Sequence, residues 1–291
     1  MLVAAYAGPV TLDAPAAFPT TLSPSRANDF LTCPLLFRLR SIDRLPEDPS
    51  PAALRGTLVH TTLEGLFDLP PSRRDATSAR GLLEEAWLTM AQDDERARAC
   101  LLEELGLPAD SSPAAVADRV IGPAEPLIDA YFAMEDPARL EPHGRELHVS
   151  VEIQDGFSIH GYVDRIDRTP AGDVRIVDYK TGRSPKAGYE SKAMFQMRFY
   201  ALAWWRMTGE IPRLLQLMYL GNREFLRYEP READLLATER KILAIREAIT
   251  RAVADGFAPT PSRLCDWCSF RALCPAFGGQ PPEPPPADEW V

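Results

Sequence analysis

The chain has 291 residues, 45% of them hydrophobic, which is enough to build the core of one large domain. No apolar run approaches the roughly 20 residues of a membrane helix, and the apolar start Met1–Ala7 lacks the basic flank of a secretory signal. We therefore expect a cytoplasmic protein with no membrane partner. Five cysteines, an odd number in a large chain, argue against a disulfide framework.

The net charge of −10 is unevenly distributed along the chain. Residues 60–155 carry 20 acidic and 8 basic side chains, whereas residues 180–227 carry 9 basic and 3 acidic ones. A basic face beside a carboxylate site suits a polyanionic substrate. Ordinary solvated surface is the alternative interpretation of the basic stretch alone.

The first part of the chain is expected to be mainly helical. Residues 1–21 form an Ala/Pro-rich extension, predicted to be a loop or an edge segment. Ser23 and Pro24 predict a helix start, and Pro34 predicts a turn or kink that presents Cys33. A further helix is expected from about residue 54 to 67. Residues 70–142 have helical spacing broken by prolines, and we interpret them as an acidic helical insertion.

Three strands are expected after this insertion. Residues 145–153 alternate between apolar and polar side chains, and Asp155-Gly156 is a hairpin turn signal. The strands 157–168 and 174–180 would complete a three-stranded meander. The remaining expected elements are a helix at 193–207, strands at 214–220 and 225–228, a long helix at 233–254, and a disordered Pro/acidic tail at 278–291.

A carboxylate–lysine centre is predicted at the end of the third strand. Asp178 and Lys180 share one face of that strand, and the hairpin brings Asp164 alongside. Two neighbouring carboxylates repel each other, and Mg²⁺ or Mn²⁺ would relieve the repulsion, with His60 completing the site. Lys180 would orient and deprotonate a water and stabilise charge at phosphorus. A surface ion pair and a structural histidine are the alternatives.

The helix that follows carries two further candidates. Gln196 and Tyr200 are four residues apart, so they lie on one helix face. That face could be directed at the metal or at the phosphate. The alternative is a glutamine at a solvent edge and a half-buried tyrosine.

The cysteines predict a second metal site. Cys265, Cys268 and Cys274 have the spacing C-x2-C-x5-C, and Cys33 is the plausible fourth thiolate. Sets of four thiolates bind Zn²⁺ or an iron–sulfur cluster, and spacing alone does not decide between them. Because Cys33 and Cys265 are 232 residues apart, the metal would staple the N-terminal helix to the C-terminal segment, which indicates a structural role.

The ordered set of motifs resembles the RecB-type branch of the PD-(D/E)XK nucleases, over residues 22–275. Its members are Ser25 with Cys33-Pro34, Gly56 with His60, the run Gly161–Asp167, the run Ile176–Gly182, Gln196 with Tyr200, and the last three cysteines. The cysteine layout is similar to that of AddB-type and CRISPR adaptation nucleases.

The resemblance implies a role for each motif residue. It implies that Mg²⁺ or Mn²⁺ is bound by His60, Asp164, Asp178 and the carbonyl of Tyr179. Lys180 would be the catalytic lysine, and Gln196 and Tyr200 would support the site and contact DNA. Cys33, Cys265, Cys268 and Cys274 would hold a [4Fe–4S] cluster, which the resemblance favours over Zn²⁺.

The expected fold is a restriction-endonuclease-like α/β core, a central mixed sheet flanked by helices, with an N/C-terminal iron–sulfur clasp. The nuclease domain would span residues 22–277, including the insertion at 70–142 and the cysteine segment at 262–277. The expected function is metal-dependent DNA hydrolysis, as an exonuclease that prefers single strands or free ends and acts in repair or recombination. Since the chain has no G-x-x-x-x-G-K-[ST] motif, we expect a free-standing nuclease domain or one that works with a separate helicase or recombination partner.

Three alternatives remain open at this point. A CRISPR spacer-processing nuclease would carry the same motifs. A non-catalytic iron–sulfur DNA-binding subunit of a helicase-nuclease would carry the cysteines, but it would not need an intact set of His60, Asp164, Asp178 and Lys180. A structural scaffold with zinc in place of the cluster is the third.

Overall fold

The computed structural model describes residues 18–186, 188, 190–286 and 290. Within this part of the chain, six strands form one mixed sheet in the order β1-β3-β4-β5-β6, and β2 pairs with β3. The β1–β3 and β4–β5 pairs are parallel, and the other pairs are antiparallel. The strand bounds are β1 Thr21–Leu22, β2 Pro142–Gln154, β3 Phe157–Arg168, β4 Val174–Lys180, β5 Leu214–Tyr219 and β6 Glu224–Tyr228.

The predicted meander is confirmed as β2-β3-β4. Strands β3 and β4 have the predicted bounds, whereas β2 begins three residues before the expected start. The short strand β1 pairs in parallel with β3, so the segment predicted as a loop or edge joins the sheet at its end. Residues 1–17 of that predicted extension lie outside the described residues.

The helices occupy the predicted segments of the chain. Their bounds are α1 Pro24–Thr32, α2 Pro34–Phe37, α3 Pro51–Leu66, α4 Ala76–Asp93, α5 Glu95–Glu104, α6 Pro113–Ile121, α7 Glu125–Met134, α8 Glu190–Thr208 and α9 Glu232–Asp255. The start of α1 is fixed locally, because the Ser23 hydroxyl accepts a hydrogen bond from the N–H of Arg26 and Pro24 fills the first turn. Cys33 lies in extended backbone between α1 and α2, so the predicted turn at Pro34 is confirmed.

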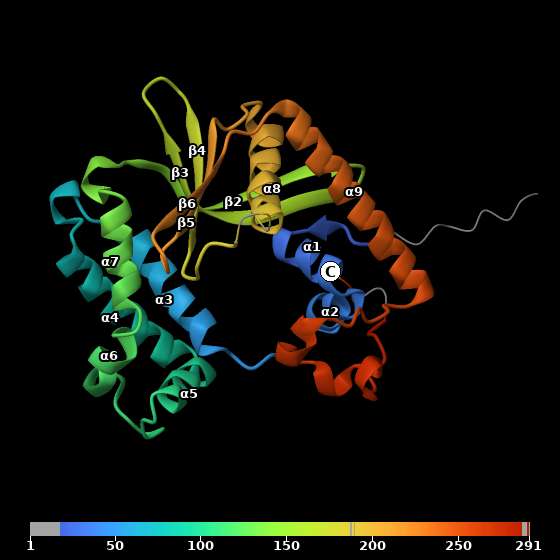
Figure 1. The fold of residues 1–291 in the computed structure, drawn as a ribbon, viewed down its shortest axis with the longest axis horizontal. Helices are drawn as coiled ribbons and strands as arrows, with labels where there is room; N and C mark the ends of the chain where they lie inside the picture. Colours follow the sequence, from blue (N-terminus) through green and yellow to red (C-terminus); the bar gives the residue numbers. More distant parts are fainter. Residues whose placement is uncertain (1–17, 187, 189, 287–289, 291) are drawn as a thin grey trace, which may run out of the picture.

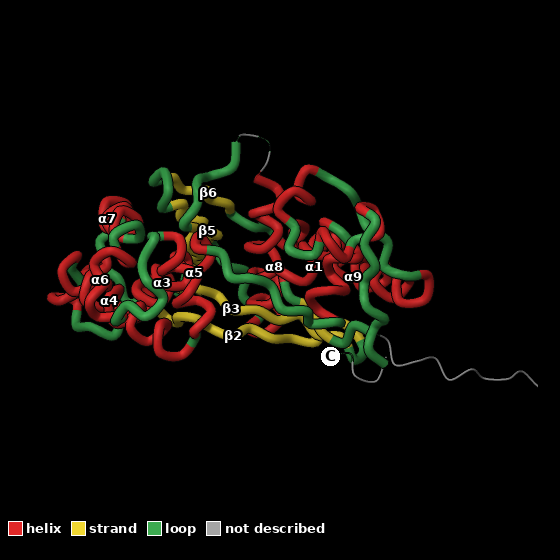
Figure 2. The backbone as a smooth tube through the Cα atoms, turned by 90° about the horizontal axis from the view of Figure 1, so that it is seen from below, coloured by secondary structure: helices red, strands yellow, loops and turns green. Residues whose placement is uncertain are grey.

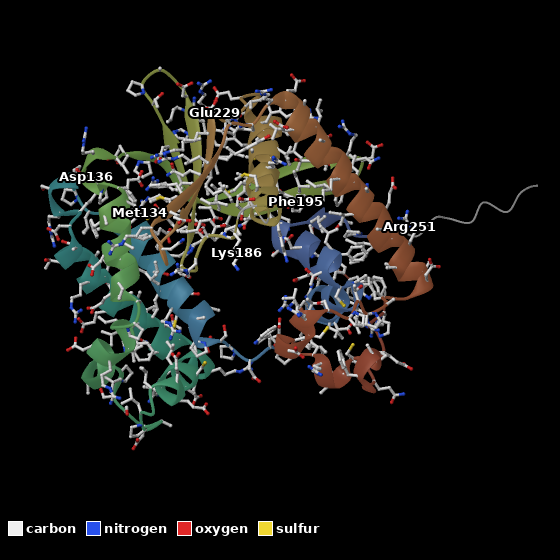
Figure 3. The ribbon with its side chains drawn as sticks, in the orientation of Figure 1. Met134, Asp136, Lys186, Phe195, Glu229 and Arg251 are labelled. Carbon is white, nitrogen blue, oxygen red and sulfur yellow. The ribbon has the colours of Figure 1, made fainter. Side chains whose placement is uncertain are left out.

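Helices cover both faces of the sheet. Helices α1, α8 and α9 pack on one face, and α3 to α7 pack on the other (Figure 1). Phe195 of α8 belongs to the first of these two cores (Figure 3). Along β4, Ile176 faces this core while Val177 and Tyr179 face the second, so β4 is buried on both sides. The α/β core with a flanked mixed sheet is therefore confirmed.

The helical segment at 70–142 contains α4 to α7, as the proline-broken pattern predicts. That this segment is an insertion relative to related nucleases stays a prediction. None of the described helices combines the length and apolar character needed to cross a bilayer.

The C-terminal segment packs against the start of the chain. Short 3₁₀ turns at Arg263–Trp267, Arg271–Leu273 and Pro275–Phe277 place Phe270 against Leu35 and Leu39. The tail at 278–291, expected to be disordered, has no helix or strand in its described residues, and two of these contact the start of the domain. The Arg38 guanidinium donates to the Pro282 carbonyl, and the Trp290 ring lies 5.1 Å from that of Phe18. Residues 287–289 and 291 lie outside the described part.

One stretch of β3 has a free edge. Strand β4 pairs with β3 only at residues 165–168, and β1 pairs with residues 158–159. Between them, no strand of the described chain pairs with this edge of residues 160–164, which carry the Gly161–Asp164 motif. Glycine is required there, since a Cβ on Gly161 would lie 2.6 Å from Cε1 of Tyr200. The motif therefore lets α8 approach the strand closely.

We predict that Gly161→Ala destabilises the fold by about 1–3 kcal/mol, because the Tyr200 ring must move out of its rotamer. Urea unfolding monitored by circular dichroism would measure the change. The matched control is Gly81→Ala in α4, where a Cβ meets nothing within 4 Å and the substitution should be neutral or stabilise by up to about 1 kcal/mol. Equal stability of Gly161→Ala and wild type would contradict the close approach.

Candidate metal centre and cysteine cavity

The predicted catalytic residues of β4 and α8 lie in contact. The Lys180 Nζ atom is 2.6 Å from Asp178 Oδ2 and donates to Gln196 Oε1 at 3.2 Å. Gln196 Nε2 in turn lies 3.0 Å from Asp178 Oδ1 and 3.0 Å from the Tyr200 hydroxyl. One glutamine amide thus connects the carboxylate, the lysine and the tyrosine, and it fixes the orientation of both charged groups.

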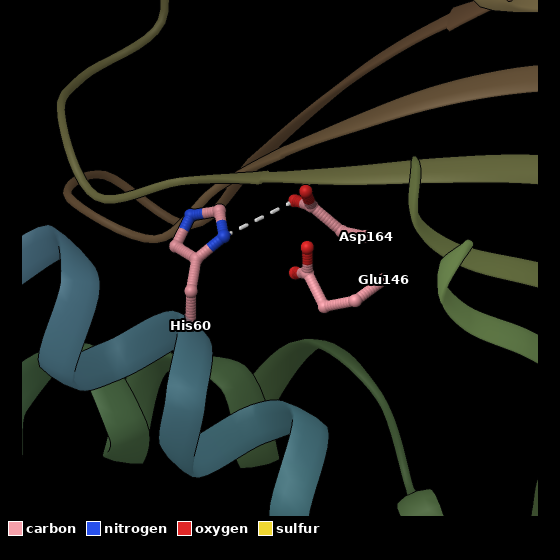
Figure 4. Close-up of side chains that lie close together, drawn as sticks. All are labelled: His60, Glu146 and Asp164. Carbon is pink, nitrogen blue, oxygen red and sulfur yellow. Dashed lines mark ion pairs between the residues drawn. The ribbon is translucent and has the colours of Figure 1, made fainter. Parts of the chain in front are cut away.

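Asp164 joins this group across the splayed strands. Its Oδ2 atom accepts a hydrogen bond from the backbone N–H of Tyr179 at 2.7 Å, just where the β3–β4 ladder ends. His60, projecting from α3, places Nδ1 at 3.4 Å from the same Asp164 oxygen (Figure 4). The residues predicted from sequence are therefore brought together from α3, β3, β4 and α8.

Glu146 is a site residue that sequence reasoning missed. Its carboxylate and ligand atoms of His60 and Asp164 all lie within 4.8 Å of one another. Figure 4 shows the three side chains directed toward one another. The backbone of Glu146 has a φ of 41°, a left-handed conformation that costs a non-glycine residue about 1–3 kcal/mol and that clusters at functional sites. The only signal in the sequence was a carboxylate on the strand that pairs with the one carrying Asp164.

The electrostatics of this group favour a cation. Burial, followed by the nearby Asp178, raises the pKa of Asp164 well above its ordinary value. Burial, together with Glu64 and Asp178, also raises the pKa of Glu146. The raised pKa values mean that ionising these carboxylates side by side costs free energy. A divalent cation between them would lower that cost.

The protonation state of His60 suits a metal ligand. Burial lowers the pKa of His60, although Asp178 and a hydrogen bond from the ring to the backbone of Tyr179 act in the opposite direction. A lowered pKa favours the neutral imidazole, which is the form that coordinates metals. The same hydrogen bond places the Tyr179 backbone, predicted to supply a carbonyl ligand, beside the histidine.

A buried ion network lies behind the centre. The Arg165 side chain is 1% exposed, donates to the Tyr179 hydroxyl at 2.7 Å and pairs with Glu135 of the helical segment at 2.7 Å. Arg175 pairs with Glu135 at 2.9 Å and with Asp167 at 2.7 Å. The two arginines and two carboxylates balance in charge, which a buried group of this kind requires.

The four predicted cysteines meet in a second place. Cys33, Cys265, Cys268 and Cys274 all line one cavity, together with apolar side chains that include Leu35, Leu39 and Phe270. Two of the sulfurs accept backbone hydrogen bonds, Cys33 Sγ from the N–H of Thr260 and Cys265 Sγ from the N–H of Ser262, each at 3.3 Å. The expected convergence of the cysteines is therefore observed, as free thiols.

The sequence model of the PD-(D/E)XK nuclease superfamily matches residues 21–275. The chain belongs to this superfamily. Membership implies a phosphodiester hydrolase that uses divalent metal and acts on DNA, and the carboxylate–histidine group is the candidate site for that metal.

The chain is also similar to individual proteins. It is 23% identical to the Gene 69 protein of Mycobacterium phage D29, over 88% of this chain and 96% of the phage protein. It is 30% identical to the Gene 69 protein of Mycobacterium phage L5, over 45% of this chain and 44% of that protein. A provisionally assigned exonuclease from Eubacterium rectale matches 86% of this chain and 90% of its own, at 14% identity and a TM-score of 0.46. At that score the structural likeness does not bear on function.

For this PD-(D/E)XK nuclease we predict that Mn²⁺ raises the thermal unfolding midpoint by about 5 °C or more when its concentration is roughly 100 times the dissociation constant. Asp164→Asn and Glu146→Gln should each lose most of this rise, because each removes one anionic ligand. Differential scanning fluorimetry would measure the midpoints.

The matched control is Glu152→Gln, which changes an exposed carboxylate on the same strand as Glu146. It should keep the full response to Mn²⁺. A wild-type response in Glu146→Gln would exclude Glu146 from the centre.

Proposed function

We propose that the chain is a Mg²⁺- or Mn²⁺-dependent deoxyribonuclease of the RecB-type branch, acting as an exonuclease on single-stranded DNA or free ends in repair or recombination. The observation that carries this proposal is the contact of Lys180 with both Asp178 and Gln196, next to the group formed by His60 and Asp164. A structural ion pair would not need a histidine and two further carboxylates at the same point.

The side chains of the centre would have two different roles, metal binding and activation of the attacking water. His60, Asp164, Asp178, the Tyr179 carbonyl and Glu146 would hold the metal, which when bound lowers the pKa of a coordinated water and offsets phosphate charge. Lys180 forms an ion pair with Asp178 and donates a hydrogen bond to Gln196. Its side chain is 30% exposed, so its ammonium group can also orient the attacking water or stabilise the charge at phosphorus.

Gln196 and Tyr200 act through their neighbours. Gln196 keeps Lys180 and Asp178 at fixed positions, and the Tyr200 hydroxyl holds the Gln196 amide. Burial raises the pKa of Tyr200, so this hydroxyl stays protonated at neutral pH and can serve as a stable partner. We assign both residues to positioning of the centre, with DNA contact on the exposed side of α8.

The charge distribution supports a nucleic-acid substrate. The basic stretch 180–227 begins at the centre itself, and Lys186 projects from the loop that follows β4 (Figure 3). Such a stretch would track the DNA backbone. The chain would act as a free-standing nuclease or together with a separate helicase or recombination partner, since it has no G-x-x-x-x-G-K-[ST] motif.

We further propose that Cys33, Cys265, Cys268 and Cys274 hold a [4Fe–4S] cluster. Backbone N–H groups directed at Cys33 and Cys265 suit thiolate ligands, since hydrogen bonds to sulfur stabilise and tune such clusters. A cytoplasmic location, which keeps thiols reduced, agrees with four unpaired cysteines in one cavity.

We predict that Asp178→Ala and Lys180→Ala each reduce DNA cleavage by at least about 100-fold while the protein remains folded. End-labelled single- and double-stranded DNA with Mn²⁺ or Mg²⁺ would measure the rate, and the product ladder would give the polarity. Lys241→Ala, an exposed lysine of α9 outside the basic stretch, is the control and should cleave as wild type does. Normal cleavage by Lys180→Ala would overturn the assignment of the centre.

Cluster loading gives a separate prediction. Anaerobically purified wild type should contain about four iron atoms per chain and absorb visible light, and Cys268→Ser should lose both and unfold at a lower temperature. The matched control is Cys100→Ser, since Cys100 lies outside the cavity and its thiol donates to the Pro49 carbonyl. If the wild type contained one zinc ion per chain and no iron, the cluster proposal would be wrong and the cysteines would form a zinc site.

A further inference from the structure

The face of α8 that carries Gln196 and Tyr200 continues toward the start of the helix. Lys192 precedes Gln196 by four residues, so their side chains share this face, with Cβ atoms about 5–6 Å apart. Exposure increases in the same direction, since Tyr200 is buried, Gln196 is half-buried and Lys192 is exposed. Because Gln196 contacts Lys180 and Asp178, the face leads from the core, past the metal centre, to the surface.

Lys192 lies where α8 meets the end of α1. The two helices are side by side in Figures 1 and 2, and the Lys192 ammonium donates a long hydrogen bond of 3.5 Å to the hydroxyl of Thr32. Thr32 is neutral, and none of the carboxylates in the described part of the chain forms an ion pair with Lys192. Asp29, three residues earlier on α1, is bound by Arg40 at 2.7 Å. The charge of Lys192 is thus held in place without being neutralised.

Other cations of the basic stretch 180–227 are engaged or placed elsewhere. Arg206 pairs with Glu239 of α9. Arg213 directly precedes β5, at the end of the sheet opposite Lys180, because β4 and β5 run in parallel. Lys192 differs from both, since it is exposed, has no carboxylate partner among the described residues and lies one helical turn from the glutamine of the centre.

The charge and position of Lys192 suit a phosphate group. A lysine ammonium is a compact point charge that binds phosphate without the fixed geometry that a guanidinium needs. The phosphodiester at the metal centre has neighbouring phosphates along the same strand. A strand that leaves the centre over Gln196 would bring the next phosphate to Lys192, one helical turn away.

We propose that Lys192 binds the phosphate next to the one that is hydrolysed. This inference rests on the proposed nuclease function and adds a direction to it. The strand would leave the centre along α8 and cross the end of α1, where Thr32 is followed by Cys33 of the cysteine cavity. Lys192 would thus bind and align the strand without touching the reacting phosphorus.

Binding of a short fluorescent oligothymidylate to the anaerobically purified full chain tests the proposal. The Lys180→Ala background with Mn²⁺ prevents cleavage while fluorescence anisotropy is measured. Lys192→Gln should weaken binding by about 3- to 30-fold at low salt. It should also reduce the slope of log K against log salt by about 0.7, the value for one phosphate contact on a single strand.

Two further variants separate the contact from a general effect of charge. Lys192→Arg keeps a cation at the position and should bind within about threefold of the parent. Lys241→Gln is the matched control, because it removes the same charge from an exposed lysine of α9. It should bind as the parent does and keep the full salt slope.

Oligonucleotides with one uncharged methylphosphonate linkage would locate the contact. The linkage is moved along the strand one position at a time. At the linkage next to the one that wild type cuts, Lys192→Gln should cause no further loss of binding, because its partner charge is already absent. At the other linkages the two losses should add.

Cleavage kinetics distinguish this contact from a structural role. With Lys180 intact, Lys192→Gln should raise KM for single-stranded DNA and change kcat by less than about threefold. The rise of the unfolding midpoint with Mn²⁺ should equal that of wild type. A loss of the Mn²⁺ response in Lys192→Gln would show that the substitution disturbs the centre, and the proposed phosphate contact would be wrong.

The outcomes are distinguishable from those of the nuclease proposal. If wild type cleaves DNA but Lys192→Gln binds the single strand as tightly as Lys241→Gln, the phosphate contact is wrong and the nuclease proposal stands. Additive losses at every linkage would also overturn the contact. If wild type neither binds nor cleaves DNA with either metal, the nuclease proposal fails and the contact fails with it.

Discussion

A single buried guanidinium connects β3 and β4, the strands that carry Asp164 and Asp178 of the metal site. Arg165 directly follows Asp164, and its partner Tyr179 directly follows Asp178, so their 2.7 Å hydrogen bond joins the strands on the face opposite the centre. Burial alone would lower the pKa of Arg165, but Tyr179 and the carboxylates of Asp167 and Glu135 raise it above its ordinary value. Because an unpaired buried charge costs several kcal/mol, the splay of β3 and β4 and the position of α7 depend on this network.

Most elements of the fold could be predicted because their ends have local causes. Ser23 and Pro24 begin α1, and the Asp155-Gly156 turn closes the β2–β3 hairpin, where Gly156 has a φ of 65°. These signals act within a few residues, so the sequence shows them directly. The pairing of β1 with β3 and the parallel pairing of β4 with β5 join residues far apart in the chain, and no local signal specifies them.

The site residues that follow from the alternation of side chains along one strand could be predicted from the sequence. Glu146 could not, because its position depends on how β2 is aligned with β3. Asp178 and Lys180 share a face by alternation alone, whereas Glu146 meets Asp164 only because the ladder shifts by one residue between Glu152 and Gln154. Continuing the Gln154–Phe157 pair without that shift would place Leu147 opposite Asp164. A slip of one residue exchanges the two faces of a strand, so this carboxylate could not be assigned without the bulge.

The cysteine cavity also sets the timing of folding during synthesis. Cys33 leaves the ribosome 232 residues before Cys265, an interval of roughly 10–50 s at ordinary elongation rates. All six strands and α9 precede Cys265 in the chain, so the sheet can assemble while the Cys33 thiol still lacks its neighbours. Closure of the cavity is then a late event, and the freshly made protein exposes Leu35 and Leu39 until Phe270 arrives to cover them.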